Sequence, residues 1–160
     1  MSNTDQKLFL YKPAFADLDM RQALLADPET MSYNKAYGGT IDWPETEWRQ
    51  WYSRWVAQDR EQCFYRYLMT ADKEFVGEVA YQLDPKLGGY MTDIIISAKH
   101  RGHGYGKTGL NLLCGAAKAR GIKVLYDNIA LDNPSINLFL AAGFIEVIRT
   151  TESILLKKEL

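Results

Sequence analysis

A glycine-rich segment at residues 101–109 has the composition of an anion-binding turn. Three β-branched apolar residues, Ile94, Ile95 and Ile96, precede it and predict a buried strand. An apolar pattern at helical spacing follows it, so the glycines lie where a strand passes into a helix. Glycine lets backbone N–H groups approach a ligand, and a helix N-terminus favours negative charge. Arg101 begins the segment and could add a guanidinium, so the sequence predicts a phosphate site here.

Two common phosphate-binding motifs fit this segment poorly. The Gly-Lys-Thr at 106–108 is similar to the end of a nucleoside triphosphate loop, but that motif requires glycine at the position of Arg101. Residues 104–109 satisfy the dinucleotide-binding pattern, with Asp127 downstream. Residues 128–160 are too few for the further strand–helix units of a dinucleotide domain, which leaves that alternative third.

A third motif matches better and has a partner downstream. The pyrophosphate loop of the GNAT acyl-CoA N-acetyltransferase superfamily, Arg/Gln-x-x-Gly-x-Gly/Ala, resembles the stretch Arg101-Gly102-His103-Gly104-Tyr105-Gly106. Residues 133–144 resemble the second signature of that family, a helix begun by asparagine (Asn133) and closed by Gly143-Phe144. Because the two motifs stand in the right order and at the right separation, the chain is identified by resemblance as a member of the superfamily.

The rest of the chain predicts elements in the order of that fold. Strands are expected at 8–12, 64–70, 75–83, 90–97, 123–130, 144–150 and 151–158, and helices at about 15–27, from Asp42 onward, at 104–121 and at 133–143. Residues 32–41, with two adjacent glycines, are expected to form a loop. The resemblance implies an α/β (α+β) fold, a GNAT-type mixed, twisted, splayed sheet of about seven strands with helices on both faces. A single GNAT domain is expected over residues 1–160.

The helix expected from Asp42 carries an aromatic stripe. Trp48, Trp51, Tyr52, Trp55 and Val56 fall at helical spacing, which predicts packing against the sheet. The resemblance implies that the first two helices and their connecting loop also line the acceptor pocket.

Composition excludes several functional classes. The chain has 160 residues, of which 24% are charged, and a formal charge of −1 without a basic block, so no nucleic-acid partner is expected. The polar start and the lack of a long apolar run favour a cytoplasmic protein with no membrane partner. Two cysteines form no disulfide framework, and His100 and His103, the only histidines, have no metal-ligand spacing with them.

The resemblance implies acetyl-CoA as cosubstrate. Its diphosphate is expected at the loop and first helical turn, residues Arg101, Gly102, His103, Gly104, Tyr105, Gly106, Lys107 and Thr108. The backbone of Ile94, Ile95 and Ile96 is expected to pair with the pantetheine arm as a strand would. Asn133, which can also cap its helix, and Phe139 complete the expected cofactor contacts.

Acyl transfer to an amine requires a base, and two carboxylates are candidates. Glu78 and Asp93 lie in central predicted strands otherwise rich in apolar residues, where a raised pKa would suit a base. For each of them, a solvated position at a sheet edge is the alternative.

The acid is where the chain departs from the family. Many members carry at the position of Phe139 a tyrosine that protonates the leaving sulfur, and phenylalanine cannot do so. Three alternatives stay open. In the first, a different tyrosine (Tyr90, Tyr105 or Tyr126) protonates the sulfur. In the second, the sulfur leaves unaided as a thiolate, because its thiol has a pKa of ~8.5 if it resembles cysteine. In the third, the protein binds acyl-CoA without catalysis.

The sequence thus predicts an acetyl-CoA-dependent N-acetyltransferase of the GNAT type. The expected acceptor is a primary amine, of a small molecule or of a protein N-terminus, which attacks directly in a ternary complex. A monomer or homodimer without metal is expected. A non-catalytic acyl-CoA sensor is the alternative function.

Overall fold

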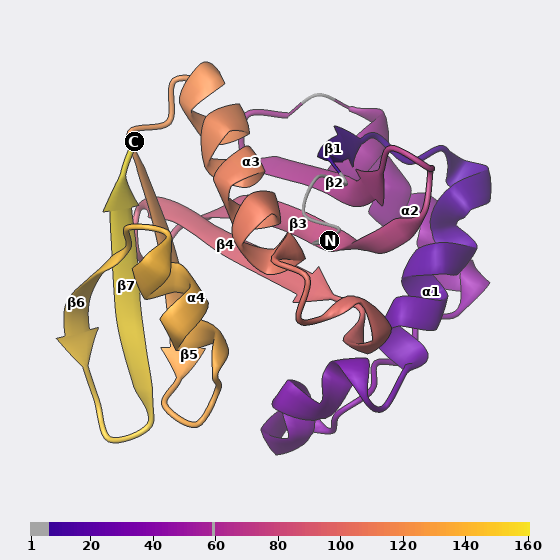
Figure 1. Cartoon of the computed structure of the whole chain (residues 1–160). Helices are drawn as coiled ribbons and strands as arrows, with labels where there is room; N and C mark the ends of the chain where they lie inside the picture. Colours follow the sequence, from indigo (N-terminus) through magenta and orange to yellow (C-terminus); the bar gives the residue numbers. More distant parts are fainter. Residues whose placement is uncertain (1–6, 59) are drawn as a thin grey trace.

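A seven-stranded mixed sheet forms the centre of the protein. The computed structural model describes residues 7–58 and 60–160. The described strands lie in the order β1-β2-β3-β4-β5-β7-β6, and among them only β4 and β5 run parallel to each other (Figure 1). Their bounds are β1 Leu8–Tyr11, β2 Cys63–Thr70, β3 Phe75–Asp84, β4 Gly89–Ile96, β5 Val124–Ala130, β6 Ile145–Arg149 and β7 Ser153–Glu159. This open, mixed sheet confirms the predicted fold class, and the strands follow one another along the chain as predicted.

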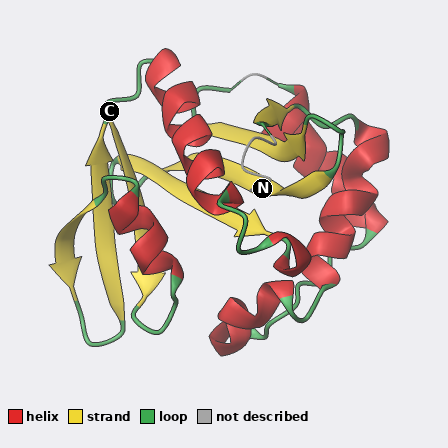
Figure 2. Cartoon of the chain, viewed as in Figure 1, coloured by secondary structure: helices red, strands yellow, loops and turns green. Residues whose placement is uncertain are grey.

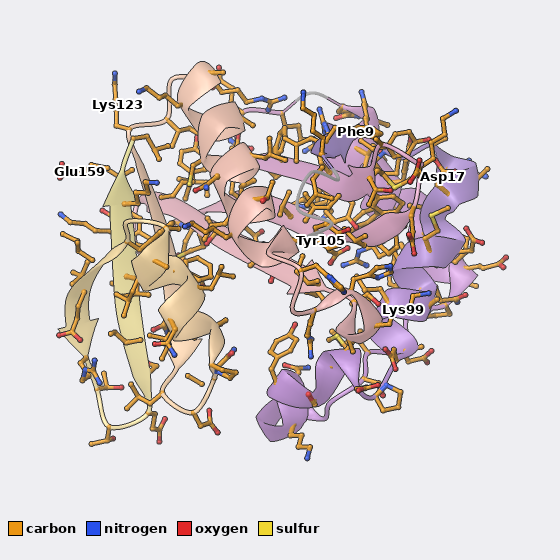
Figure 3. All side chains as sticks on the ribbon, viewed as in Figure 1. Phe9, Asp17, Lys99, Tyr105, Lys123 and Glu159 are labelled. Atoms are coloured by element: carbon orange, nitrogen blue, oxygen red, sulfur yellow. The ribbon has the colours of Figure 1, made fainter. Side chains whose placement is uncertain are left out.

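Helices cover both faces of the sheet (Figure 2). On one face lie α1, Leu18–Ala26, and α2, Trp48–Tyr52, which continues as a π-helical turn at Ser53–Ala57. On the other face lie α3, Tyr105–Ala119, and α4, Ser135–Ala141. Figure 3 shows Lys123 and Glu159 at the end of the sheet where β5 begins and β7 ends. Across residues 7–58 and 60–160, every helix is too short or too polar to cross a bilayer.

Two local predictions are wrong. Residues 32–41, expected to form a loop, contain most of a 3-10 helix at Thr30–Tyr37. The helix expected from Asp42 begins instead with a 3-10 turn at Glu45–Glu47, directly after Pro44. Proline is favourable there because it lacks the N–H that a helix start would leave without a partner. The capping residue of this helix is therefore set by proline and not by the Asp42 carboxylate.

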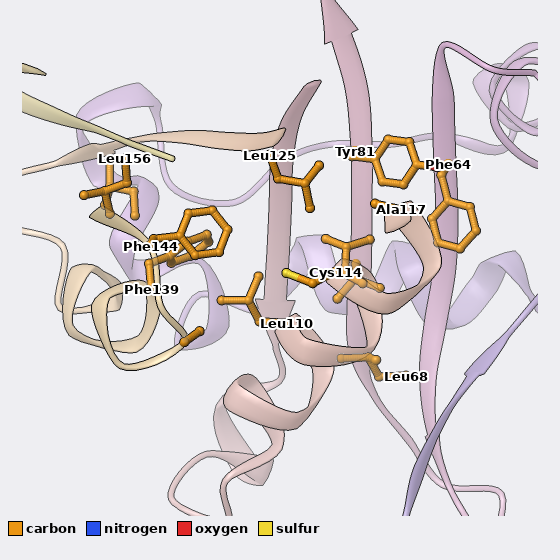
Figure 4. Close-up of a cluster of buried hydrophobic side chains, with 14 of the residues drawn as sticks. Phe64, Leu68, Tyr81, Leu110, Cys114, Ala117, Leu125, Phe139, Phe144 and Leu156 are labelled. Carbon is orange, nitrogen blue, oxygen red and sulfur yellow. The ribbon is translucent and has the colours of Figure 1, made fainter. Parts of the chain in front are cut away.

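The main core lies between the sheet and helices α3 and α4. Because side chains alternate along a strand, every second residue of β2, β3 and β5 points to this face. Helix α3 contributes side chains three and four residues apart, as an amphipathic helix should. The buried residues at the centre of this core, shown in Figure 4, include Phe64, Leu68, Tyr81, Leu110, Cys114, Ala117, Leu125, Phe139, Phe144 and Leu156.

The opposite face carries the aromatic stripe of the α2 region. Trp48 is buried and stacks on Trp43, with ring centroids 5.4 Å apart. Both belong to the same buried cluster as Ile95 of β4. Trp51 meets Tyr65 of β2 edge to face at 4.7 Å. The stripe therefore packs on the sheet as predicted, and it also brings tryptophan rings close to the centre of β3 and β4.

The sheet splays between β4 and β5. These parallel strands pair at Tyr90 with Leu125 and at Met91 with Tyr126, and no further pair is formed in the described strands. By contrast, the whole length of β4 is paired with β3, from Gly89 opposite Asp84 to Ile96 opposite Gly77. The edge of β4 from Thr92 to Ile96 that faces β5 is therefore left without a strand partner.

A side-chain cap starts α4, and this position gives a stability prediction. Asn133 Oδ1 accepts a hydrogen bond from the backbone N–H of Ser135 at 2.9 Å. We expect Asn133→Ala to lower the free energy of unfolding by about 0.5–2 kcal/mol, because an N–H at the helix start loses its acceptor. Urea unfolding monitored by circular dichroism measures this. Asn137→Ala, in the exposed part of the same helix, is the control and should be neutral or slightly stabilising. Equal stability of Asn133→Ala and the unmodified protein would contradict the capping role.

Candidate functional site

The phosphate loop joins β4 to α3 through a tight turn and two left-handed glycines. A 3-10 turn at Ala98–His100 follows β4, and Gly102 and Gly104 then adopt φ angles of +81° and +79°. Residues with a side chain rarely take up these angles. Gly104 directly precedes α3, whose first N–H groups have no partner inside the helix. Left-handed turns of this kind point backbone N–H groups into a shared concavity, so the loop fits the diphosphate expected there.

The side chain of Arg101 is held by the protein itself. Its Nη2 donates to the carbonyl oxygen of Thr30 at 2.8 Å, and its backbone N–H donates to Ala98 O at 3.2 Å. Thr30 is fully buried, and its Oγ1 accepts a hydrogen bond from the N–H of Ala98 at 2.9 Å. The Thr30 hydroxyl donates a hydrogen bond to Asp27 Oδ2 at 2.5 Å. Arg101 therefore fastens the phosphate loop to the segment after α1, a role that its sequence position did not indicate.

Two other contacts fix the ends of this loop. His100 Nε2 lies 2.7 Å from Glu74 Oε1 in the turn between β2 and β3. Gly106 faces α4, where an added Cβ would lie 3.1 Å from Leu138, so this glycine also permits close packing of α3 on α4. The rings of His103 and Tyr105 lie tilted to each other with centroids 5.8 Å apart, whereas Lys107 and Thr108 are exposed in the first turn of α3. The predicted loop residues are thus brought together at one end of the β4–β5 split.

The expected pantetheine strand has the geometry that pairing requires. Ile94 and Ile96 pack toward α3, and Ile95 is buried on the opposite face. Their backbone edge toward β5 lacks a strand partner in the described chain, as stated above. An extended ligand arm leaving the phosphate loop can therefore add to this edge in the manner of an extra strand.

A buried ion pair lies beneath α1 and α2. The guanidinium of Arg21 lies over the rings of Trp43, at 4.4 Å, and Trp51, at 4.5 Å. Its Nε donates to Glu78 Oε2 at 3.1 Å, and the hydroxyl of Tyr65 donates to the same oxygen. Glu78, one of the two candidate bases, is not at a solvated sheet edge: it is only 3% exposed and already accepts these two hydrogen bonds. It therefore acts first as the counter-ion of Arg21.

Asp93, the second candidate base, has a different environment. It lines a cavity of about 120 Å³ together with Arg21, Trp51, Trp55 and Glu78. Its side chain is exposed to solvent. The pKa of Asp93 is raised to about 6, first by desolvation and then by charge repulsion from Glu78, while the positive charge of Arg21 acts to lower it. A carboxylate with this pKa is ionised at neutral pH and can still take up a proton.

Phe139 lies in the core. It is 1% exposed, and its ring centroid is 4.9 Å from that of Phe144 (Figure 4). The tyrosines considered as substitutes for the missing hydroxyl lie elsewhere. Tyr90 and Tyr126 line a groove at the end of the sheet away from the phosphate loop, and Tyr105 lies at the loop itself.

Several residues of the site have no counterpart in the sequence-based prediction. Arg21 carried a readable signal, because it lies three residues after Leu18 and four before Leu25, on the buried stripe of α1. A charge on such a stripe requires a buried partner. Thr30 and Thr92 gave no such signal, since their roles depend on contacts with residues far along the chain.

Comparison with known proteins agrees with this geometry. The model of the acetyltransferase (GNAT) family matches residues 20–144. Spermidine N-acetyltransferase from Vibrio cholerae, solved in complex with CoA and spermine, has a TM-score of 0.78 at 19% identity, over 97% of this chain and 96% of that one. The GNAT domain of S. lividans PAT has a TM-score of 0.76 at 15% identity, over 96% and 89% of the two chains.

Two further comparisons complete this result. A putative phosphinothricin N-acetyltransferase has a TM-score of 0.71 at 20% identity, over 96% of this chain and 98% of that one. A search of curated protein sequences gave no match. Since the family model matches most of the chain and includes both the phosphate loop and α4, the chain belongs to the acetyltransferase (GNAT) family and is an acetyl-CoA-dependent acetyltransferase.

Proposed function

We propose that this enzyme transfers the acetyl group of acetyl-CoA to the primary amine of a small molecule, by direct attack in a ternary complex. The observation that carries the proposal is the separation of β4 and β5 beyond the pairs Tyr90–Leu125 and Met91–Tyr126, which is called the fork below. The phosphate loop lies at its open end, and Asp93 lies on its β4 arm facing the cavity under α1 and α2. Strand β4 thus carries both the open edge expected to bind the cofactor and, within a few residues of it, the candidate base.

The cofactor side of the proposal uses mainly backbone groups. The N–H groups of the loop from Gly102 to Gly106 bind the diphosphate, and the exposed Lys107 and Thr108 stand beside them. The open edge of β4 at residues 94–96 pairs with the pantetheine arm. Asn133 and Phe139 act by fixing α4 along the other side of this path, the first as its cap and the second through the core.

The chemical step on the acceptor side is proton removal by Asp93. An alkyl amine is mostly protonated at neutral pH and attacks only as the free base. Asp93 is ionised above its pKa of about 6, so it can accept that proton beside the reacting carbon. The Arg21–Glu78 pair is internally neutral and leaves Asp93 as the net charge of the cavity, which favours a cationic amine.

The cavity favours a small acceptor over a protein N-terminus. Its volume of about 120 Å³ is roughly four times the share of one water molecule in the liquid. Trp51 and Trp55 form one wall, and aromatic faces attract ammonium groups. The Vibrio cholerae neighbour was solved with spermine, which is itself an amine, and this supports the class of acceptor.

A substitution in the phosphate loop tests the cofactor side of this proposal. Gly104→Val should weaken acetyl-CoA binding at least tenfold, about 1.4 kcal/mol, because valine disfavours the left-handed angle and places a branched side chain where the phosphate must approach. Isothermal titration calorimetry with acetyl-CoA measures this. Gly88→Val is the matched control, since Gly88 also has a positive φ, +70°, but lies in the β3–β4 turn. Equal affinity of a folded Gly104→Val protein and the control would contradict the assignment of the loop.

A further inference from the structure

Arg21 has hydrogen-bond donors left over after its pairing with Glu78. Its Nε–H donates to Glu78 Oε2 at 3.1 Å, and its two Nη nitrogens carry the remaining N–H groups of the guanidinium. Among the described residues no hydrogen bond uses these Nη nitrogens, and neither nitrogen is a buried atom without a partner. The Nη groups therefore reach the cavity that Arg21 lines.

The geometry around this guanidinium suits a carboxylate ligand. Its central carbon lies 4.4 Å from the ring centroid of Trp43 and 4.5 Å from that of Trp51, so aromatic faces lie against it. The N–H groups point outward in the guanidinium plane, where the two Nη groups form a fork that matches the two oxygens of a carboxylate. Within the described part of the chain, Glu78 is the single carboxylate at ion-pair distance from Arg21, and it meets the Nε edge. The Nη edge is therefore suited to an oxyanion that a ligand supplies.

Asp93 lies close enough to this guanidinium to bind the amine of the same ligand. In the register of β3 and β4, Asp93 faces Ala80, and Glu78 lies two residues away along β3 on the same face. Diagonal neighbours of this kind are about 7–8 Å apart. Arg21 is held at Glu78, so its cation and the Asp93 carboxylate both line one small cavity. An amine at Asp93 and a carboxylate at Arg21 would then place opposite charges next to each other throughout.

The rest of the cavity disfavours an acceptor with two cationic ends. Among the described residues its charged lining consists of Arg21, Glu78 and Asp93, and Glu78 is already paired. A second ammonium group would meet no unpaired carboxylate there, and the charge of Arg21 would repel it. Trp51 and Met91 supply apolar surface to the same cavity, which suits a hydrocarbon side chain.

We propose that the acceptor of this enzyme is an α-amino acid with an apolar side chain, and that Arg21 selects it by binding its carboxylate through the Nη groups. This inference rests on the proposed function and names the acceptor class of the same site. The α-amine lies at Asp93, and the side chain lies against Trp51 and Met91. A peptide N-terminus has no carboxylate beside its amine, so the same contact disfavours peptides.

Three acceptors with the same side chain test this proposal on the unmodified enzyme. Leucine has the carboxylate, leucinamide replaces it with a neutral amide, and isopentylamine lacks the group. With acetyl-CoA, kcat/KM for leucine should exceed that for each of the other two at least tenfold, because they cannot form the charged hydrogen bonds to Arg21. The less basic amine of leucinamide loses its proton more readily, so intrinsic reactivity cannot produce this preference. Equal or higher kcat/KM with leucinamide or isopentylamine would overturn the inference and leave the proposed function intact.

The variant Arg21→Lys tests the residue itself. Lysine keeps a positive charge beside Glu78 but has no planar fork, so the preference for leucine over leucinamide should fall about tenfold. Arg149→Lys is the matched control, because Arg149 pairs with Glu146 on the surface, and it should keep the preference. An unchanged preference in a folded Arg21→Lys enzyme would contradict the selecting role of Arg21.

Calorimetry gives a readout that does not depend on transfer. The unmodified protein, saturated with CoA so that no acetyl group is present, is titrated with leucine and with leucinamide. Leucine should bind at least tenfold more tightly, and equal affinities would overturn the inference. If leucine binds with this preference and none of the three acceptors is acetylated, the proposed transfer is wrong while the carboxylate site at Arg21 stands. If Arg21→Lys does not fold, these comparisons on the unmodified protein decide the question.

Discussion

An Asp93→Asn enzyme is expected to have a kcat about 10²–10⁴-fold below that of the unmodified enzyme, the range observed when a general base is removed. The amide cannot accept the amine proton, while its size and its place on β4 are kept. Acetyl-CoA affinity should be preserved, because the phosphate loop and the open edge at residues 94–96 lie elsewhere on the fork. The quantity to measure is kcat at saturating concentrations of both substrates, with acetyl-CoA binding measured separately.

The pH dependence of kcat provides a second test of Asp93 as the base. A base must be ionised to act, so kcat of the unmodified enzyme should rise as pH passes about 6, the pKa of Asp93, and level off above it. This rise of kcat near pH 6 should be missing in Asp93→Asn. It should be present in the control Asp72→Asn, an exposed change in the turn between β2 and β3. A folded Asp93→Asn enzyme with unmodified kcat and the same rise would show that another group takes the proton.

Arg21→Met is expected to give the largest loss of stability. Glu78 would keep a buried charge without its counter-ion, and removing one partner of a buried ion pair costs about 3–5 kcal/mol. The aromatic rings of Trp43 and Trp51 would also lose the cation between them. Urea unfolding at neutral pH measures the effect.

Two further variants identify the source of this loss. The double change Arg21→Met with Glu78→Gln should recover part of the stability, since the buried charge is then absent. Arg149→Met is the matched control, because Arg149 pairs with Glu146 on the surface, where such pairs contribute about 0–1 kcal/mol. If the double variant is no more stable than Arg21→Met alone, the loss comes from packing and the account of the ion pair is wrong.

The parts of the site that the sequence predicts are local ones. The loop from Gly102 to Gly106 follows from glycines between a strand and a helix, and the cap at Asn133 follows from its place before Pro134. Each depends on a few neighbouring residues, whose backbone angles and hydrogen bonds are read from residue type alone. The order of helices and strands along the chain also follows, because hydrophobic periodicity marks each element separately.

The parts that escape prediction depend on distant residues. The hydrogen bond from the Arg101 guanidinium to Thr30, seventy-one positions away in sequence, has no local sequence signal. Residue type and strand position do not distinguish Glu78 from Asp93 as candidate bases. They differ in the fold because Arg21 of α1 forms an ion pair with Glu78, whereas the pKa of Asp93 is raised. Contacts between residues so far apart have no characteristic spacing in the sequence, so they can be identified only in the folded structure.

The central claim is that the fork holds acetyl-CoA on one side and an amine on the other for direct transfer. The most direct measurement mixes the purified protein with acetyl-CoA and, separately, with small primary amines and with peptides bearing a free N-terminus. Free thiol and N-acetylated product are then quantified together by mass spectrometry. The account predicts equal amounts of thiol and N-acetyl product with at least one small amine, and little product with peptides, because of the small cavity beside Asp93. Tight acetyl-CoA binding without N-acetylation of any amine would contradict it.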